Sequence, residues 1–189
     1  MMALKHLCSI SFALLFLGTG CAFMGRSEVS EIVYHDLSTL KEEQVVSPPA
    51  EFRVFSDITG NGIRPVTRLG DGSVALGEKH RFSGSPVQLI RRRLTELFPP
   101  ASPEAPLKIS GTLYRFELDS GKNQAMLGID YLLTYKKCRT VQRHRIGVKI
   151  AGEGQNAGFT ALEKCIIRSA RRLGEESSNF VKQCESKNK

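Results

Sequence analysis

The sequence predicts an α+β fold: a mostly antiparallel β-sheet of four to six strands with two helices packed on one face. Two segments, 86–98 and 160–180, carry apolar residues at helical spacing behind a capping motif. Between them, residues 107–150 divide into three segments in which apolar and polar residues alternate, the pattern of strands in series. Packing the helices on one face of the sheet buries the apolar face of every element.

The first helix is predicted to begin at Ser85-Pro86-Val87-Gln88, which combines a capping box with proline at the first helical position. Pro99-Pro100 is predicted to end it. The last helix is predicted to begin at a second capping box, Thr160-Ala161-Leu162-Glu163. Its buried side is expected to comprise Leu162, Ile166, Ala170, Leu173, Ser177 and Phe180.

The strands differ in how clearly the sequence defines them. Short extended segments are expected at 32–37, 52–55, 63–69 and 74–82. In residues 107–118 the apolar positions change parity around Gly111, which predicts a bulge or a bend. Residues 125–135 alternate without a break, and the following strand is expected to point Ile146 and Val148 inward.

Composition excludes several classes of protein. The chain has 189 residues, which suits one domain, and its 41% hydrophobic and 24% charged content excludes wholesale disorder. Lys and Arg number 27 against 19 Asp and Glu, which gives a net charge of +8. There is no Trp, only 4 His, and no Cys/His or acidic cluster with metal-ligand spacing. The counts favour a protein that is not an enzyme and binds no metal or cofactor.

The N-terminal segment is predicted to be a targeting signal. Lys5 and His6 precede the apolar run 7–17, which has the length of a signal-peptide core and is too short to span a bilayer comfortably. Small residues then precede Cys21, an arrangement that resembles a bacterial lipoprotein signal, in which a diacylglycerol is attached to the cysteine and the chain is cut before it. Ala22 follows, and by resemblance to Gram-negative lipoproteins this favours the outer membrane. An ordinary secretory signal cut near Ala22 is the alternative.

The chain is therefore divided into a signal peptide (1–20), a tether (21–31), a single α+β domain (32–183) and a polar tail (184–189). The acyl chains would hold the domain on the periplasmic face of the outer membrane. An exported protein does not meet nucleic acid, so we expect its basic surface to face anionic lipid or an acidic partner.

Three cysteines remain in the domain and tail, an odd number for an oxidising compartment. Cys165 and Cys184 fall on one predicted helix, about 28 Å apart along its axis, which is too far for a disulfide. A bridge would therefore use Cys138, with either Cys165 or Cys184. Three buried thiols are the alternative.

The candidate nucleophiles and bases form no recognisable catalytic pattern. Gly84-Ser85-Pro86 opens a helix, and no G-x-S-x-G nucleophile elbow is present. His35, His80 and His144 are scattered over separate strands or loops. His144 alternates with Arg143 and Arg145, which predicts an inward or interfacial position for it. The Gly-rich segment 152–158 lacks the spacing of a dinucleotide fingerprint. The sequence predicts no catalytic residue.

Basic residues gather in two regions. The last helix carries Lys164, Arg168, Arg171 and Arg172 opposite its apolar stripe. The last hairpin carries Lys136, Lys137, Arg139, Arg143, Arg145 and Lys149. Such clusters ordinarily form a solvated basic face. The functional alternative is a surface for anionic lipid headgroups or for an acidic partner.

Short motifs follow the signal in a fixed order. They are Tyr34-x-x-Leu37, Arg81–Pro86 opening the first helix, Leu113–Glu117, and the extended strand 125–134. Over about residues 30–183 this order resembles the ABC-type transport auxiliary lipoproteins, the family of the third protein of the paraquat-inducible operon. The resemblance implies a non-enzymatic outer-membrane lipoprotein that partners an MCE-type protein in lipid transport between the two membranes, without catalytic residues.

Two other classes of lipoprotein stay open. The small lipoprotein that plugs the lipopolysaccharide translocon has a similar basic α+β architecture with two helices. A lipoprotein that activates peptidoglycan synthesis is the second class. All three are binding proteins, and they differ in the partner they would be found with.

Overall fold

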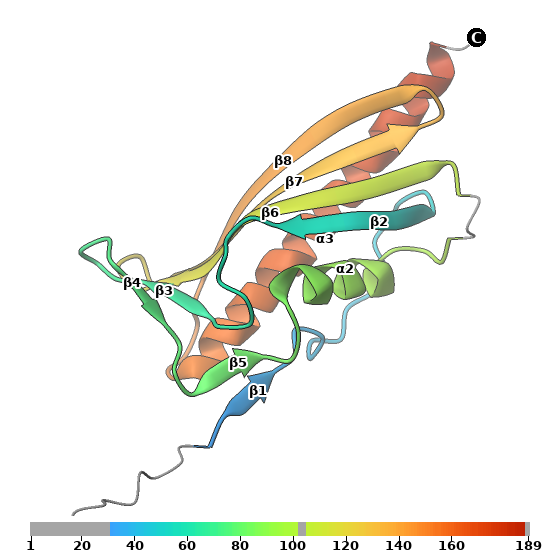
Figure 1. Cartoon of the computed structure of the whole chain (residues 1–189). Helices are drawn as coiled ribbons and strands as arrows, with labels where there is room; N and C mark the ends of the chain where they lie inside the picture. The colour runs from blue at the N-terminus through green and yellow to red at the C-terminus, as the bar shows by residue number, and fades with distance from the viewer. Residues whose placement is uncertain (1–30, 102–104, 188–189) are drawn as a thin grey trace, which may run out of the picture. The chain divides into compact units, whose positions relative to one another are not determined.

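The computed structural model describes residues 31–101 and 105–187 (Figure 1). The predicted signal, Cys21 and residues 21–30 of the predicted tether lie outside the described residues. From Ile32 onwards the chain forms one compact unit. Its elements are β1 (Val33–His35), β2 (Ala50–Asp57), β3 (Val66–Arg68), β4 (Val74–Leu76), β5 (His80–Phe82), α2 (Pro86–Leu97), β6 (Leu107–Asp119), β7 (Gln124–Tyr135), β8 (Cys138–Lys149) and α3 (Gln155–Ser186).

The main sheet has six strands and confirms the α+β class with a mostly antiparallel sheet, since three of its five strand pairings are antiparallel, although it is mixed rather than purely antiparallel. Strands β6, β7 and β8 form the predicted antiparallel meander. Strands β2 and β3 both run parallel to β6, along the same edge. A parallel pair needs a long crossover connection, and α2 lies within the one that joins β2 to β6. A second, two-stranded sheet pairs β1 with β5 in parallel.

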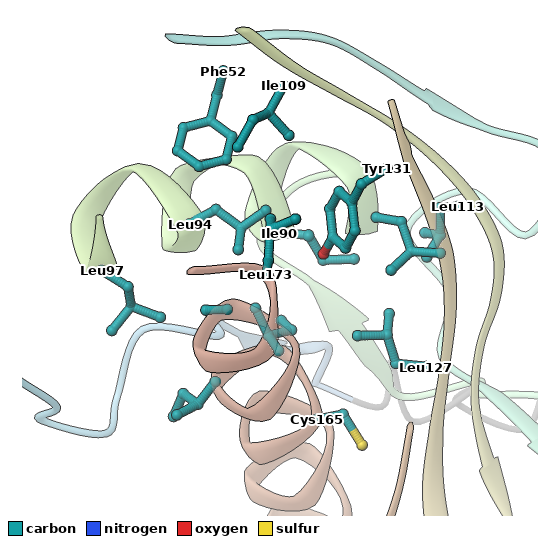
Figure 2. Close-up of a cluster of buried hydrophobic side chains, with 14 of the residues drawn as sticks. Phe52, Ile90, Leu94, Leu97, Ile109, Leu113, Leu127, Tyr131, Cys165 and Leu173 are labelled. Carbon is teal, nitrogen blue, oxygen red and sulfur yellow. The ribbon is translucent and has the colours of Figure 1, made fainter. Parts of the chain in front are cut away.

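Both helices cover one face of the main sheet, as predicted (Figure 1). Helix α3 packs on β7 and β8, and α2 packs on β2 and on α3. Figure 2 shows the resulting core, in which α2 contributes Ile90, Leu94 and Leu97 and α3 contributes Cys165 and Leu173. The strands contribute Phe52, Ile109, Leu113, Leu127 and Tyr131 to the same cluster. The 32 residues of α3 extend about 48 Å, enough to follow the long strands of the meander.

The boundaries of α3 differ from the prediction at both ends. The helix begins at Gln155, five residues before the expected capping box, and its N-cap is Gly154 with a φ of 85°. It ends at Ser186, three residues into the expected tail, because buried Cys184 still packs on the core. Helix α2 does begin after Ser85, but the Ser85 side chain makes no capping hydrogen bond.

The predicted irregularity of β6 lies three residues beyond Gly111. The pairing of β6 with β7 shifts between Leu113 and Arg115, so Tyr114 is the bulged residue. Gly128 faces this bulge, and a Cβ there would lie 2.4 Å from the Tyr114 ring. Gly111 instead makes room for the ring of Phe55, which would lie 2.6 Å from a Cβ at that position. The parity change around Gly111 therefore correctly indicated a bulge, and the pairing of β2 with β6 also shifts next to Gly111, between Phe52 and Phe55.

A buried carboxylate joins three segments on the helical side of the sheet. The side chain of Glu163, 1% exposed, lies 3.3 Å from Nη2 of Arg93 on α2. It also accepts hydrogen bonds from the backbone N–H groups of Thr39 and Leu40, at 3.2 and 2.9 Å, and from the Thr39 hydroxyl. Arg93 in turn donates to the carbonyl of Leu40. Glu163 was predicted to cap its own helix, but its partners lie on α2 and on the loop after β1.

We expect Glu163→Ala to lower the free energy of unfolding by about 3 kcal/mol, because it leaves a buried guanidinium and two backbone donors without their carboxylate. Arg93 keeps its ion pair with Glu96, 3.0 Å away. The expected loss of stability is therefore at the low end of the range for breaking a buried ion pair. The matched control is Glu42→Ala, which removes an exposed partner of Arg171 and should cost less than about 1 kcal/mol. Chemical denaturation measures both, and equal losses would contradict the assigned role.

Candidate functional site

The sheet face opposite the helices carries an apolar centre. Val54, Leu132 and Val141 are 73%, 39% and 52% exposed, and they line one shallow depression of about 410 Å³. Leu132 and Val141 are directly paired across β7 and β8. The remaining lining residues are Ser56, Ser110, Gly111, Thr112 and Asp130. Single exposed apolar residues are common, but here three strands contribute them to one site, which we call the open face.

Basic side chains of β8 flank the open face. Strand residues of one parity share a face, so Arg143 and Arg145 point to the same side of the sheet as Val141. Arg139 has the same parity but also lines a groove between β8 and α3. Arg143 lies 3.6 Å from Asp130, and Nε of Arg145 donates to the Tyr114 hydroxyl at 3.4 Å. An apolar centre with arginines at its margin is the composition typical of protein–protein interfaces.

The predicted basic stripe of α3 is exposed, but its members have different neighbours. Arg171 pairs with Glu42, and Arg172 pairs with Glu176 at 2.8 Å. Arg168 donates to the Gly147 carbonyl at 3.4 Å, and Lys164 is exposed. Two of the four charges therefore have an acidic partner within the fold. Helix α3 packs on the face of the sheet opposite the open face (Figure 1), and its stripe approaches β8 at the edge of the sheet, where Arg168 contacts Gly147.

A buried polar network lies between β7, β8 and α3. His144 is fully buried, and its Nδ1 lies 2.8 Å from Oγ of Ser169. Its Nε2 lies 2.8 Å from Oε2 of Glu176, while the Tyr131 hydroxyl lies 3.0 Å from Oγ of Ser169. The alternation of β8 correctly predicted that His144 points inward. Its partners could not be predicted, because they lie 25 and 32 residues further along the chain.

These residue types could be mistaken for a nucleophile–base–acid triad. Ser169, however, is 0% exposed and lies between the helix and the sheet, so a substrate carbonyl cannot reach its hydroxyl in this arrangement. Burial raises the pKa of Tyr131, whose hydroxyl stays a neutral partner in the network. We interpret the network as a set of satisfied hydrogen bonds that fixes α3 on the sheet.

The structure brings together two histidines for which the sequence predicts positions on separate strands or loops. Pairing of β1 with β5 places Nε2 of His35 2.7 Å from Nδ1 of His80. The His35 ring also stacks on Phe159, with ring centroids 3.6 Å apart. Burial and the neighbouring His80 lower the pKa of His35. The contact attaches the first strand of the unit to α3.

The cysteine geometry corrects one expected pairing. Cys165 is fully buried, and its Sγ lies 3.4 Å from the Ala125 carbonyl and 3.8 Å from that of Ile146. Ile146 lies eight residues along β8 from Cys138, about 26 Å at the rise of a strand. A Cys138–Cys165 disulfide is therefore excluded in this fold. Burial raises the pKa of Cys165 to about 12.

Residues 31–101 and 105–187 hold no group of three or more His, Cys, Asp or Glu side chains placed to bind a metal ion. Neither helix within those ranges combines the length and apolar character needed to cross a bilayer.

The network makes the stability of the fold dependent on pH. Burial lowers the pKa of His144 below its ordinary value of 6.5, although Glu176 partly opposes the shift. As the pH falls below 6.5, the unfolded chain binds this proton first, so stability is complete above that pH and decreases below it. We expect wild-type protein to lose about 1 kcal/mol more free energy of unfolding than His144→Gln between pH 7.5 and 5.5. Urea titrations at both pH values test this, and parallel losses would contradict it.

Comparison with known proteins shows the fold alone. A crystal structure described as that of an uncharacterized protein has a TM-score of 0.64 at 10% identity, covering 77% of this chain and 98% of that one. The crystal structure of protein XCC0632 from Xanthomonas campestris, of the DUF330 family, has a TM-score of 0.61 at 11% identity, covering 82% and 99%. No protein-family model and no curated protein matches the chain. The described unit therefore has an architecture that occurs in solved structures of other proteins.

Proposed function

We propose that this protein is a non-enzymatic outer-membrane lipoprotein that serves as an auxiliary component of an ABC/MCE-type intermembrane lipid transport system. The observation that carries the proposal is a lipoprotein-like signal ending at Cys21, followed by a compact unit whose sheet presents an apolar centre flanked by arginines. The partner class comes from the order of motifs over residues 30–183, which resembles that family.

The two faces of the sheet support a division of roles. The helical face is occupied by the core, the Glu163 contacts and the His144 network, so it is committed to folding. On the open face, the side chains of Val54, Leu132 and Val141 are exposed, so the fold does not require them for packing. An interface needs an apolar centre that excludes water and polar groups at its margin, and the open face supplies both.

The anchor and the domain have separate tasks in this proposal. Acyl chains on Cys21 would hold the protein at the periplasmic face of the outer membrane. Two or more such chains are enough to anchor a protein stably in a bilayer. The domain would then bind the MCE-type protein through the open face. The basic residues of β8 would favour an acidic partner surface, or anionic lipid headgroups at the margin of the complex.

A crosslinking pull-down with matched charge reversals tests the docking surface. We expect wild-type protein to recover an MCE-type protein, and the double variant Arg143→Glu, Arg145→Glu to recover it about tenfold less, because two charges change sign at the margin of the open face. The control is Arg168→Glu, Arg171→Glu, which makes the same change in net charge on α3 and should recover it as wild type does.

Other partners would identify other functions. Recovery of the β-barrel lipopolysaccharide translocon or of a penicillin-binding protein, in place of an MCE-type protein, would contradict the proposal. Loss of recovery with the α3 variant alone would instead make the helix stripe the docking surface.

A further inference from the structure

The end of α3 is docked against the turn between β7 and β8. The hydroxyl of Tyr135, the last residue of β7, donates a 2.8 Å hydrogen bond to Oε1 of Glu185. Phe180 and Cys184 lie one turn apart on the helix and are both buried. The last turns of α3 are therefore part of the packed structure and have a defined position relative to the start of β8.

Two cysteines meet at this contact. Cys138, the first residue of β8, pairs in register with Tyr135, and Cys184 directly precedes Glu185. Both cysteines line one groove of about 410 Å³ between β8 and α3. Their thiols share a hydrogen bond. Burial, followed by this hydrogen bond with Cys138, raises the pKa of Cys184 to about 11.

We propose that Cys138 and Cys184 form a disulfide that joins the first residue of β8 to the last turn of α3. The proposal rests on the proposed function only for its oxidant, since export places the domain in an oxidising compartment. Cys165 has no part in the bridge, because it lies 19 residues before Cys184 on the same helix, about 28 Å away. Its sulfur contacts the opposite end of the β7–β8 pair.

The exposure of the two thiols sets the order of the chemical steps. The oxidant is the disulfide of an exported thiol–disulfide oxidoreductase. Cys138 is half-buried at the groove, so its thiolate can attack one sulfur of that disulfide and release the other as a thiolate. The thiolate of buried Cys184 then attacks the Cys138 sulfur and releases the oxidoreductase. In total, the two thiols lose two protons and two electrons. The disulfide of the oxidoreductase gains these protons and electrons and becomes two thiols.

The bridge would restrain the unfolded chain between residues 138 and 184. A disulfide stabilises by closing a loop in the unfolded ensemble, so the oxidised protein should unfold at a higher temperature than the reduced protein. It would also hold the last turn of α3 at one end of the groove. The sequence predicts that any bridge would use Cys138, with Cys165 or Cys184 as its partner, and the fold favours Cys184.

The test uses the mature protein purified in detergent and reduced. It is equilibrated with oxidised glutathione, alkylated, digested, and mapped without reduction. We expect one linked peptide pair, Cys138 with Cys184, and an alkylated Cys165 after unfolding. Cys165→Ser should give the same linked pair, and Cys184→Ser should leave Cys138 as a thiol or as a mixed disulfide with glutathione, linked to no other cysteine of the chain. Adding reductant should lower the unfolding midpoint of the wild type and leave that of Cys184→Ser unchanged.

Two results would overturn the pairing. One is alkylation of both Cys138 and Cys184 after equilibration with the oxidant, and the other is a linked peptide that contains Cys165. Protein isolated directly from cells provides a separate arm. If it is isolated reduced but forms the Cys138–Cys184 link with glutathione, the pairing stands and the exported location in the proposed function is contradicted.

Discussion

The arrangement of the two helices depends on the contacts of one buried carboxylate, that of Glu163. A charge in the interior is tolerated only when it is paired and hydrogen-bonded, and Glu163 meets that requirement with groups from two other segments. Arg93 comes from α2, and the N–H groups of Thr39 and Leu40 come from the loop after β1. Satisfying this one side chain therefore requires α2, α3 and the N-terminal loop to be in place together.

Because α2 and α3 are both held on one face of the sheet, the helical face is buried and the open face is exposed. On the helical face, apolar packing and buried polar groups reinforce each other, since His144, Ser169 and Glu176 are bonded within a layer formed by residues such as Leu173 and Tyr131. On the open face, Leu132 and Val141 form a cross-strand pair that remains exposed. The proposed function assigns that exposed pair to a partner protein. The proposed disulfide acts elsewhere, at the end of α3.

Local patterns predicted the local structure well. The alternation of residues 125–135 and the inward position of His144 were correct because strand periodicity depends only on neighbouring residues. The parallel pairing of β2 and β3 with β6 was missed, since direction depends on a crossover that no local pattern encodes. For the same reason Glu163 was interpreted as a capping residue, and the His35–His80 contact, 45 residues apart, was not expected. The open face also depends on long-range pairing, because β6 and β7 lie between Val54 on β2 and Val141 on β8 in the sheet.

The proposed attachment of this unit to a membrane is tested most directly by the mass of its N-terminal peptide, after expression of the full chain in a Gram-negative host. If the protein is lipid-anchored, its mature chain begins at Cys21 and fractionates with the outer membrane. The mass of its first peptide is then increased by a diacylglycerol and an acyl chain on Cys21. Cys21→Ala should abolish both the added mass and the membrane fraction. An unmodified chain that begins downstream of Cys21 and is freely soluble in the periplasm would contradict it.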